Sequence, residues 1–436
     1  MKYYNKLSSL LLTALVVASS FSLQSCKKDQ PDEFKLTGGI PTINYSRPAS
    51  ASASDSLLVQ AYPQANICLV GSNLTSIQQM YFNDKKAILN TSFITDNTLI
   101  VQIPSEIPDL VTDKIYIITT DHDTLTYDFH IVIPAPNVSQ MSCEYAKPGS
   151  IATIYGSYFV DDPNVPLTVT FPDGQIAEIK SINSSRSAIQ IVVPECTTEG
   201  QIEVASIYGK SLSKFYYHDS RGLITNFDGA TDVVPQGWNI AATYSDENGI
   251  DGQYVQVGPA ETEGGWVEEL KLPFWCGNWN GDPMSITSGP GIPLRNFLNF
   301  SDWQNMSFKM ELYIPKSNPW SAGAMQIIFV NNLQCANDSW QNNTYIHTSA
   351  DGGLDLPRAL YRPWEATGSF DTGDEWITVT IPLTDFVYND DGSKVSTTMS
   401  ESSFDSFIIW PINGGVAGTV CTPIFRYDNI RVVPNL

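Results

Sequence analysis

Segments in which apolar and polar residues alternate recur along the chain after residue 40, as in Leu167-Thr168-Val169-Thr170-Phe171. This period of two predicts β-strands that bury one face and expose the other. From Arg221 onward, no window carries apolar residues at the i, i+3, i+4 and i+7 spacing of an amphipathic helix. The pattern therefore predicts an all-β fold.

The first half of the chain contains an internal repeat of roughly 90 residues. Three pairs of segments match in the same order: residues 67–74 with 152–159, 80–84 with 169–173, and 99–104 with 189–194. A repeat of this length suits an immunoglobulin-sized β-sandwich. We therefore predict two such domains, at residues 41–134 and 135–219, with the stiff segment Pro134-Ala135-Pro136 between them.

The repeat resembles the IPT/TIG family of immunoglobulin-like domains. The second copy has the opening Pro148-Gly149-Ser150, a Gly-Ser turn before an aromatic residue, and an apolar strand that ends in proline. The first copy departs from this pattern, because Pro63-Gln64-Ala65 stands at its opening. Neither copy holds a tryptophan or a cluster of catalytic residue types, so both are interpreted as spacers.

The composition changes at Arg221, after which Gly, Trp, Asn and Asp become frequent. All ten tryptophans lie between Trp238 and Trp410. Five segments have the strand pattern, namely residues 306–312, 325–330, 376–381, 407–410 and 424–433. Together they predict one large jelly-roll-like β-sandwich over residues 220–436.

The N-terminus has the features of an export signal. Lys2 and Lys6 precede a short apolar stretch from Leu10 to Ala18, which is far below the ~20 residues of a membrane-spanning helix. The sequence Leu23-Gln24-Ser25-Cys26 resembles a bacterial lipobox, and the acidic residues after it resemble the export signal of outward-facing Bacteroidota lipoproteins. We expect a signal peptide at residues 1–25, a lipidated Cys26, a flexible tether at residues 26–40, and an outer-membrane protein exposed at the cell surface.

Charge and composition restrict the ligand. Without the signal, 22 basic residues face 46 acidic ones, a net charge of −24. Such a field repels nucleic acid, anionic lipid and polyanionic glycans, so a neutral ligand fits best. The four histidines are scattered, which argues against a metalloenzyme. The six cysteines after Cys26 allow 15 pairings, and small buried thiols are an equally good interpretation.

The whole arrangement resembles the surface glycan-binding lipoproteins of Bacteroidota, and within them the B-type β-glucan or xyloglucan binders. Phe227-Asp228-Gly229 and the segment from Tyr427 to Val432 resemble the first and last strands of jelly-roll carbohydrate-binding modules. The resemblance implies a C-terminal domain that binds a neutral polysaccharide, spacers that project it outward, and an outer-membrane glycan importer as partner. Only the lipid anchor would contact the membrane.

Carbohydrate recognition needs flat aromatic rings in loops, with polar residues at their rim. The glycan-binding candidates are loop residues of the C-terminal domain: Trp275, Trp279, Asn280, Tyr361, Arg362, Trp364, Trp320 and Trp340. Trp376, Trp303 and Trp238 are interpreted as structural, whereas Trp266 and Trp410 stay undecided. Because all the indoles lie there, residues 220–436 are expected to bind glycan alone.

Catalysis is not expected. A glycosidase needs two carboxylates held about 5 to 9 Å apart, and no Glu-x-Asp-x-x-Glu stretch occurs. The nearest acidic clusters are Glu268-Glu269 and Glu261-x-Glu263, interpreted as solvated surface. The alternative functions are a surface adhesin or spacer that binds a protein and, less favoured, a glycoside hydrolase. No cofactor is expected, although Asp228 and Asp428 could hold a structural Ca²⁺; turn hydrogen bonding is the simpler interpretation.

Overall fold

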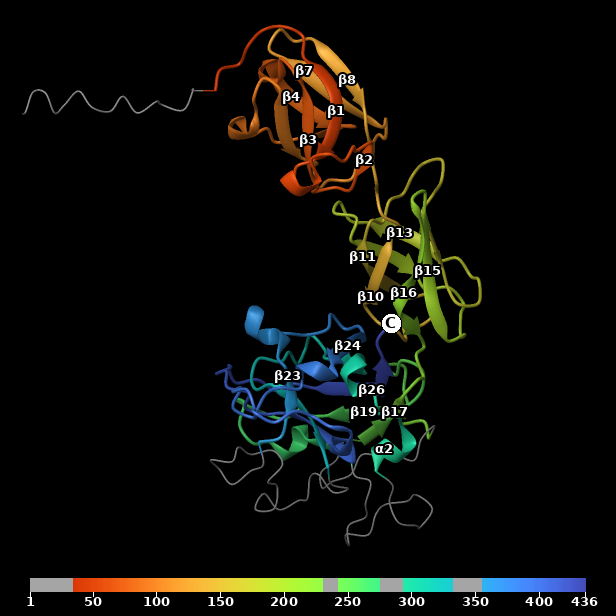
Figure 1. Cartoon of the computed structure of the whole chain (residues 1–436). Coiled ribbons are helices and arrows are strands. Elements are labelled where there is room, and N and C mark those ends of the chain that lie inside the picture. The colour runs from red at the N-terminus through yellow and green to blue at the C-terminus, as the bar shows by residue number, and fades with distance from the viewer. Residues whose placement is uncertain (1–33, 230–241, 275–292, 332–354) are drawn as a thin grey trace, which may run out of the picture. The chain divides into compact units, whose positions relative to one another are not determined.

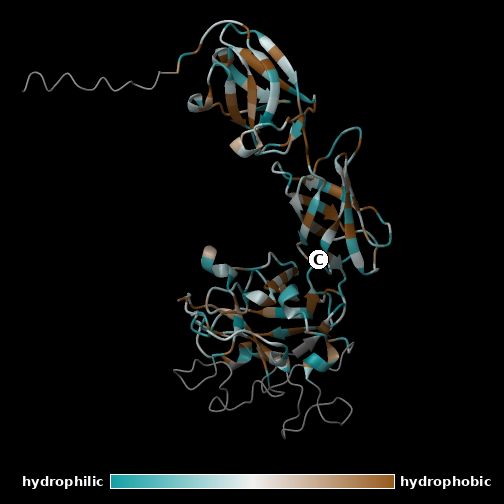
Figure 2. Ribbon diagram, viewed as in Figure 1, coloured by the Kyte–Doolittle hydropathy of each residue, from teal (hydrophilic) through white to brown (hydrophobic). Residues whose placement is uncertain are grey.

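The computed structural model describes residues 34–229, 242–274, 293–331 and 355–436. It divides into two compact units, Met1–Pro134 and Ala135–Leu436 (Figure 1). The regular secondary structure of the described residues is mainly β-strand, which confirms the predicted all-β fold. Figure 2 shows that the hydrophobic residues concentrate on these strands. Among the described residues, no helix is long and apolar enough to span a bilayer.

The first unit is a sandwich of two main sheets. One sheet has the order β1-β3-β6 and the other β5-β4-β7-β8, while β2 and β9 form a short parallel pair. The strands are β1 (Thr42–Pro48), β2 (Gln60–Ala61), β3 (Asn66–Ser72), β4 (Ile77–Phe82), β5 (Lys85–Lys86), β6 (Thr98–Gln102), β7 (Lys114–Thr119), β8 (Thr124–Asp128) and β9 (His130–Ile131).

The second unit begins with a sandwich of the same kind, formed by sheets β10-β11-β14-β13 and β12-β15-β16. Its strands are β10 (Asn137–Met141), β11 (Ile151–Ser157), β12 (Thr168–Thr170), β13 (Glu178–Ile182), β14 (Ala188–Val192), β15 (Gly200–Ser206) and β16 (Gly209–Tyr217). The repeat segments found in the sequence lie on the equivalent strand pairs β3/β11, β4/β12 and β6/β14.

The Gly-Ser turn of the repeat has a steric cause. A Cβ on Gly71 would lie 1.8 Å from the carbonyl oxygen of Thr42, and one on Gly156 would lie 1.8 Å from that of Asn137. In both sandwiches the neighbouring strand pairing shifts register at this point. Two backbones approach so closely here that only glycine fits.

The C-terminal sandwich packs two sheets. Its first sheet has the order β18-β19-β26-β21-β24, with β17 also paired to β26, and its second has the order β20-β25-β22-β23. The strands are β17 (Leu223–Thr225), β18 (Ala242–Tyr244), β19 (Tyr254–Val257), β20 (Leu272–Phe274), β21 (Met306–Tyr313), β22 (Met325–Val330), β23 (Arg358–Tyr361), β24 (Ile377–Pro382), β25 (Ser406–Pro411) and β26 (Phe425–Pro434). The described part of this sandwich also has the short α-helix α2 (Leu294–Phe297) and the 3-10 turn η7 (Pro363–Ala366).

The core of this sandwich is aromatic. Phe329 of β22 lies edge-on to Phe308 of β21 at 6.2 Å and tilted against Phe407 of β25 at 5.5 Å, so rings from both sheets meet between them.

In the first two sandwiches, the thiols of Cys68, Cys143 and Cys196 are free and buried. These three therefore act as small core residues.

The second and third sandwiches share a packed junction. Ile250, from a loop of the third, belongs to the core of the second, and Trp376 packs against the same core. The Trp376 indole N–H donates to the carbonyl oxygen of Asn248 at 2.8 Å, and its ring meets Tyr254 edge-on. Trp376 is half-buried and has the structural role expected from its place at the start of the predicted strand 376–381.

Buried charges cross this junction. Glu144 of the second sandwich lies 2.5 Å from the Lys309 ammonium and 2.7 Å from the Arg431 guanidinium of the third. Arg431 also lies 2.6 Å from Glu311. Burial exceeds the attraction of Arg431 and raises the pKa of Glu311 to about 7. We name Glu144, Lys309, Glu311 and Arg431 the junction ion network.

Candidate functional site

Half of the glycan-binding candidates lie outside the described residues. These are Trp275, Trp279, Asn280 and Trp340, and the expected lipidation site Cys26 lies outside as well. Whether these residues bind glycan or lipid stays a prediction.

Trp320 does not face solvent. Its side chain is fully buried, its indole N–H donates to the carbonyl oxygen of Ala322 at 2.7 Å, and its ring packs edge-on against Phe425 at 5.2 Å. Residue 320 also pairs with Phe370 through an isolated β-bridge. The expectation of an exposed loop ring is therefore wrong here, because the loop turns the indole into the core.

Trp364 is also buried, with 4% of its surface exposed. It lies on η7, which directs the ring inward, and its indole N–H donates to the carbonyl oxygen of Gly323 at 2.8 Å. Gly323 has φ +75°, a backbone conformation that favours glycine, and a Cβ on it would lie 3.3 Å from the Cα of Gly264. The ring that the sequence suggested as a platform is a structural support.

Tyr361 and Arg362 are half-buried neighbours of these indoles. The Tyr361 ring meets Phe370 edge-on and Trp320 at a tilt, and burial raises the pKa of Tyr361 to about 12. Arg362 lies 2.7 Å from Glu365 and donates to the carbonyl oxygen of Gly414. Both side chains hold the β23–η7 corner together, and their contact with a glycan stays a prediction.

The outward face of the second sheet carries a row formed by Trp410, which the sequence left undecided, and by Gln326 and Arg358, which the sequence analysis did not single out. Met325 and Phe329 of β22 point into the core, so Gln326 points outward. Trp410 of β25 pairs with Gln326 in register. Because Arg358 of β23 pairs with Ile328, it lies on the same face.

This row is buried and hydrogen-bonded. Arg358 donates to the amide oxygen of Gln326 at 2.8 Å, and burial lowers the pKa of Arg358 to about 10. Gln326 donates to the carbonyl oxygen of Ile412 at 2.8 Å. The Trp410 indole donates to the carbonyl oxygen of Val267 at 3.1 Å, and the Lys271 ammonium lies 5.4 Å from its ring centre. The row fixes the loops that cross this face of the sheet.

The strand ends next to the remaining candidates converge. Phe274, which ends β20, pairs with Phe407, and Val330, which ends β22, pairs with Ser406. Arg358, which begins β23, pairs with Ile328 at the same end of the sheet. The chain therefore leaves β20 toward Trp275 and Trp279, and leaves β22 toward Trp340, from one edge of one sheet.

The start of α2 lies at the same edge of the second sheet. The backbone N–H of Leu294 donates to the carbonyl oxygen of Asp405, which directly precedes β25. Arg295 forms an ion pair with Asp405 at 2.7 Å, and Phe300 stacks on Phe404 at 4.1 Å. Both ends of the segment that carries Trp275 and Trp279 are thus attached to the start of β25.

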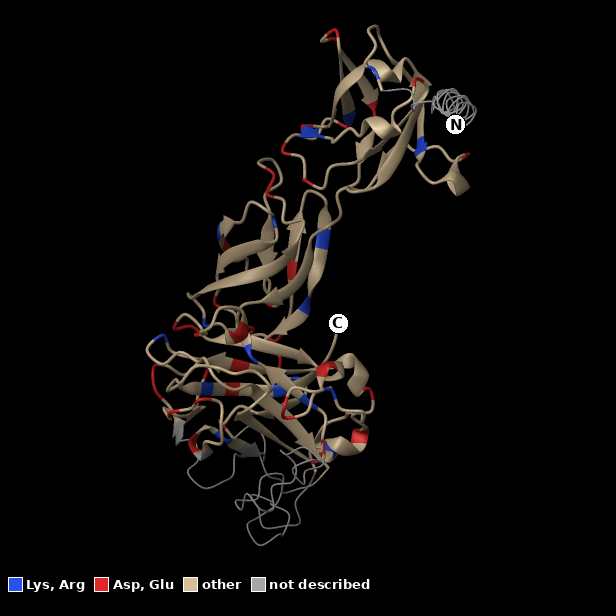
Figure 3. Cartoon of the chain, turned by 90° about the vertical axis from the view of Figure 1, so that its left-hand side faces the viewer, with Lys and Arg blue, Asp and Glu red and all other residues tan. Residues whose placement is uncertain are grey.

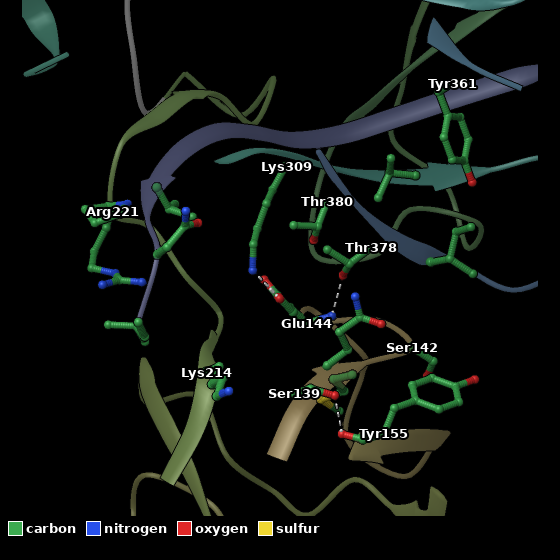
Figure 4. A pocket seen from close by; sticks show the side chains of 18 residues that line it. Ser139, Ser142, Glu144, Tyr155, Lys214, Arg221, Lys309, Tyr361, Thr378 and Thr380 are labelled. Atoms are coloured by element: carbon green, nitrogen blue, oxygen red, sulfur yellow. Dashed lines mark hydrogen bonds and ion pairs between the residues drawn. The ribbon is translucent and has the colours of Figure 1, made fainter. Parts of the chain in front are cut away.

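A pocket of about 510 Å³ lies at the junction between the second and third sandwiches (Figure 4). Lys309 and Glu144 point toward one another inside it, and the hydroxyl of Thr378 accepts from the backbone N–H of Glu144 at 2.7 Å. Lys and Arg residues are otherwise scattered over the sandwiches (Figure 3).

Comparison with known families identifies the class of protein to which this chain of β-sandwiches belongs. Residues 217–434 match the family described as "Surface glycan-binding protein B xyloglucan binding domain". The chain belongs to the surface glycan-binding protein B family.

Two relatives show how far the similarity extends. The crystal structure of surface glycan-binding protein PbSGBP-B from Prevotella bryantii has 37% sequence identity and a TM-score of 0.75, and the match covers 92% of this chain and 100% of that one. An IPT/TIG domain-containing protein from Bacteroides ovatus is 27% identical over 241 residues, or 52% of this chain. That match spans about half (48%) of the curated relative.

Proposed function

We propose that this protein binds a neutral β-glucan, with xyloglucan as the first candidate, through its C-terminal sandwich and without catalysis. The observation that carries the proposal is the match of residues 217–434 to a xyloglucan-binding domain family. The net charge supports a neutral ligand. Cys26 would anchor the chain by lipid to the outer membrane at the cell surface, and an outer-membrane importer would receive the glycan.

The aromatic residues that bind the glycan are proposed to be Trp275, Trp279 and Trp340. Their chain segments start from one edge of the second sheet, so rings from different segments can act on one ligand. Stacking against one ring contributes about 1–3 kcal/mol, by analogy with base stacking. A sugar ring offers an apolar face for such stacking and hydroxyl groups for polar neighbours such as Asn280.

The test is isothermal titration of the chain from Lys27 onward with xyloglucan, mixed-linkage β-glucan, β-1,3-glucan and polygalacturonate. We expect binding to at least one neutral glucan, no binding to polygalacturonate, and no release of reducing sugar. Trp275→Ala and Trp279→Ala should each weaken binding at least tenfold with an unchanged melting temperature.

Tyr155→Ala is the matched control, because it removes a ring that is 43% exposed on the second sandwich. Its affinity should equal that of the unaltered chain. Absence of binding to every neutral glucan refutes the function. Undiminished binding in both tryptophan variants refutes the choice of residues and leaves the function intact.

A further inference from the structure

Asp428 of β26 carries a buried carboxylate oxygen without a partner. The residue is fully buried, and its Oδ1 accepts from the backbone N–H of Asn429 at 2.8 Å. Its Oδ2 has no hydrogen-bond partner in the described structure. An uncompensated carboxylate in such a place is costly, so a proton or a cation must neutralise it.

Two further carboxylates lie beside it. Asp251 is within hydrogen-bonding reach of Asp428, and the Asn429 side-chain amide donates to both oxygens of Asp251 at 3.1 and 3.2 Å. Asp228 repels the charge on both. Its Oδ1 accepts from the backbone N–H of Gln253 at 2.6 Å, which holds it beside the same loop.

No ion pair neutralises this group in the part of the chain that the structure describes, where Asp228, Asp251 and Asp428 all lack a Lys or Arg partner within 4.0 Å. Burial and the two neighbouring carboxylates raise the pKa of Asp428 to about 10. Asp251 and Asp228, from two other segments, are thus near enough to Asp428 to act on its charge.

The donor atoms available here are oxygens, which hard cations prefer. No three acidic, histidine or cysteine side chains of the described residues already converge at metal-binding distances. Main-chain carbonyls and water would therefore complete the shell, and Ca²⁺ tolerates such an irregular shell of 6–8 oxygens better than Mg²⁺ does.

We propose that Asp428 and Asp251, with Asp228 beside them, bind a calcium ion that ties β26 to the loop before β19 and to the turn after β17. The loop before β19 also carries Ile250 into the core of the second sandwich, and its Asn248 accepts from the Trp376 indole. The ion would therefore stabilise the junction between the two sandwiches. This proposal does not depend on glycan binding.

The test uses the chain from Lys27 onward, stripped with EGTA and then titrated with CaCl₂ or MgCl₂ at pH 7. At a calcium concentration about 100 times Kd the melting temperature of residues 135–436 should rise by roughly 5 °C, and Mg²⁺ should do much less. Terbium should give sensitised luminescence that Ca²⁺ displaces. Asp428→Asn should abolish both responses, because the amide keeps the shape and removes the charge.

Asp374→Asn is the matched control, since Asp374 is a carboxylate of the same unit with its side chain 48% exposed. Its calcium response should equal that of the unaltered chain. If the melting temperature changes with neither Ca²⁺ nor EGTA but rises on acidification, a proton neutralises the site. That result overturns the proposal. If the calcium response persists in the Asp428→Asn variant, the ion binds elsewhere and the proposed site is wrong.

Discussion

Removal of the Glu144 carboxylate should destabilise the unit formed by residues 135–436. Glu144 contacts Lys309 at 2.5 Å and Arg431 at 2.7 Å, and the three side chains are 3%, 7% and 0% exposed. Glu144→Ala would leave Lys309 without an ion pair among the described residues. Arg431 would keep Glu311 at 2.6 Å.

The size of the destabilisation can be estimated from this geometry. Removal of one partner of a buried ion pair costs roughly 3–5 kcal/mol, because the other charge stays buried. One cation is stranded and the second retains a carboxylate, so we expect the lower end, about 3 kcal/mol. In a unit of this size, that corresponds to a fall in melting temperature of roughly 6 °C.

Differential scanning calorimetry measures the fall in melting temperature, and Glu178→Ala is the matched control. Glu178 pairs with Lys180 at 2.6 Å in the same sandwich, but the two side chains are 64% and 45% exposed. Exposed pairs contribute about 0–1 kcal/mol, so this control should hardly shift the transition. A Glu144→Ala loss no larger than the control's would refute the reasoning.

The junction ion network also affects the stability of the fragment of residues 220–436, which is expected to bind glycan alone. Residues 220–436 contain Lys309 and Arg431 but not Glu144. The isolated fragment should therefore melt below the fragment of residues 135–436. Its glycan affinity has to be measured at a temperature where it is folded.

Two further predictions concern burial. Trp364→Ala should lower the free energy of unfolding by about 3–5 kcal/mol in urea titrations, since the ring is 4% exposed; a loss under about 1 kcal/mol would contradict this. Glu311 has a folded pKa of about 7, above its ordinary 4.5, so its contribution to stability is present below about pH 4.5 and is lost as pH rises through 7. Glu311→Gln should flatten this part of the profile in chemical denaturation at pH 5, 6, 7 and 8, and equal profiles would contradict the shift.

The strands could be predicted from sequence because their signal is local. The expected segment 325–330 is β22 to the residue, and the segment 376–381 differs from β24 by one residue at each end. Alternation reports which side chains a strand buries, and this requires no knowledge of distant partners. The repeat could be recognised for a similar reason, because Gly71 and Gly156 each permit the same close backbone contact in their copy.

Contacts between distant residues could not be predicted. Glu144 and Arg431 are 287 positions apart, and nothing local marks either as a buried ion. Trp320 and Trp364 lie in segments rich in loop-forming residues, which suggested exposure. Whether a loop ring turns outward or into the core depends on the space beneath it, here the backbone at Gly323 and the ring of Phe425.

The concentration of tryptophan in the C-terminal half therefore has two sources. Of the six indoles in the described residues, Trp320, Trp364 and Trp410 are buried, and the other three are half-buried. Three of the six described indoles thus fill the core of the large sandwich and donate to backbone carbonyl oxygens. This supports the proposal that the aromatic platform draws on the four remaining indoles, three of which, Trp275, Trp279 and Trp340, follow strands that end at one edge of the second sheet.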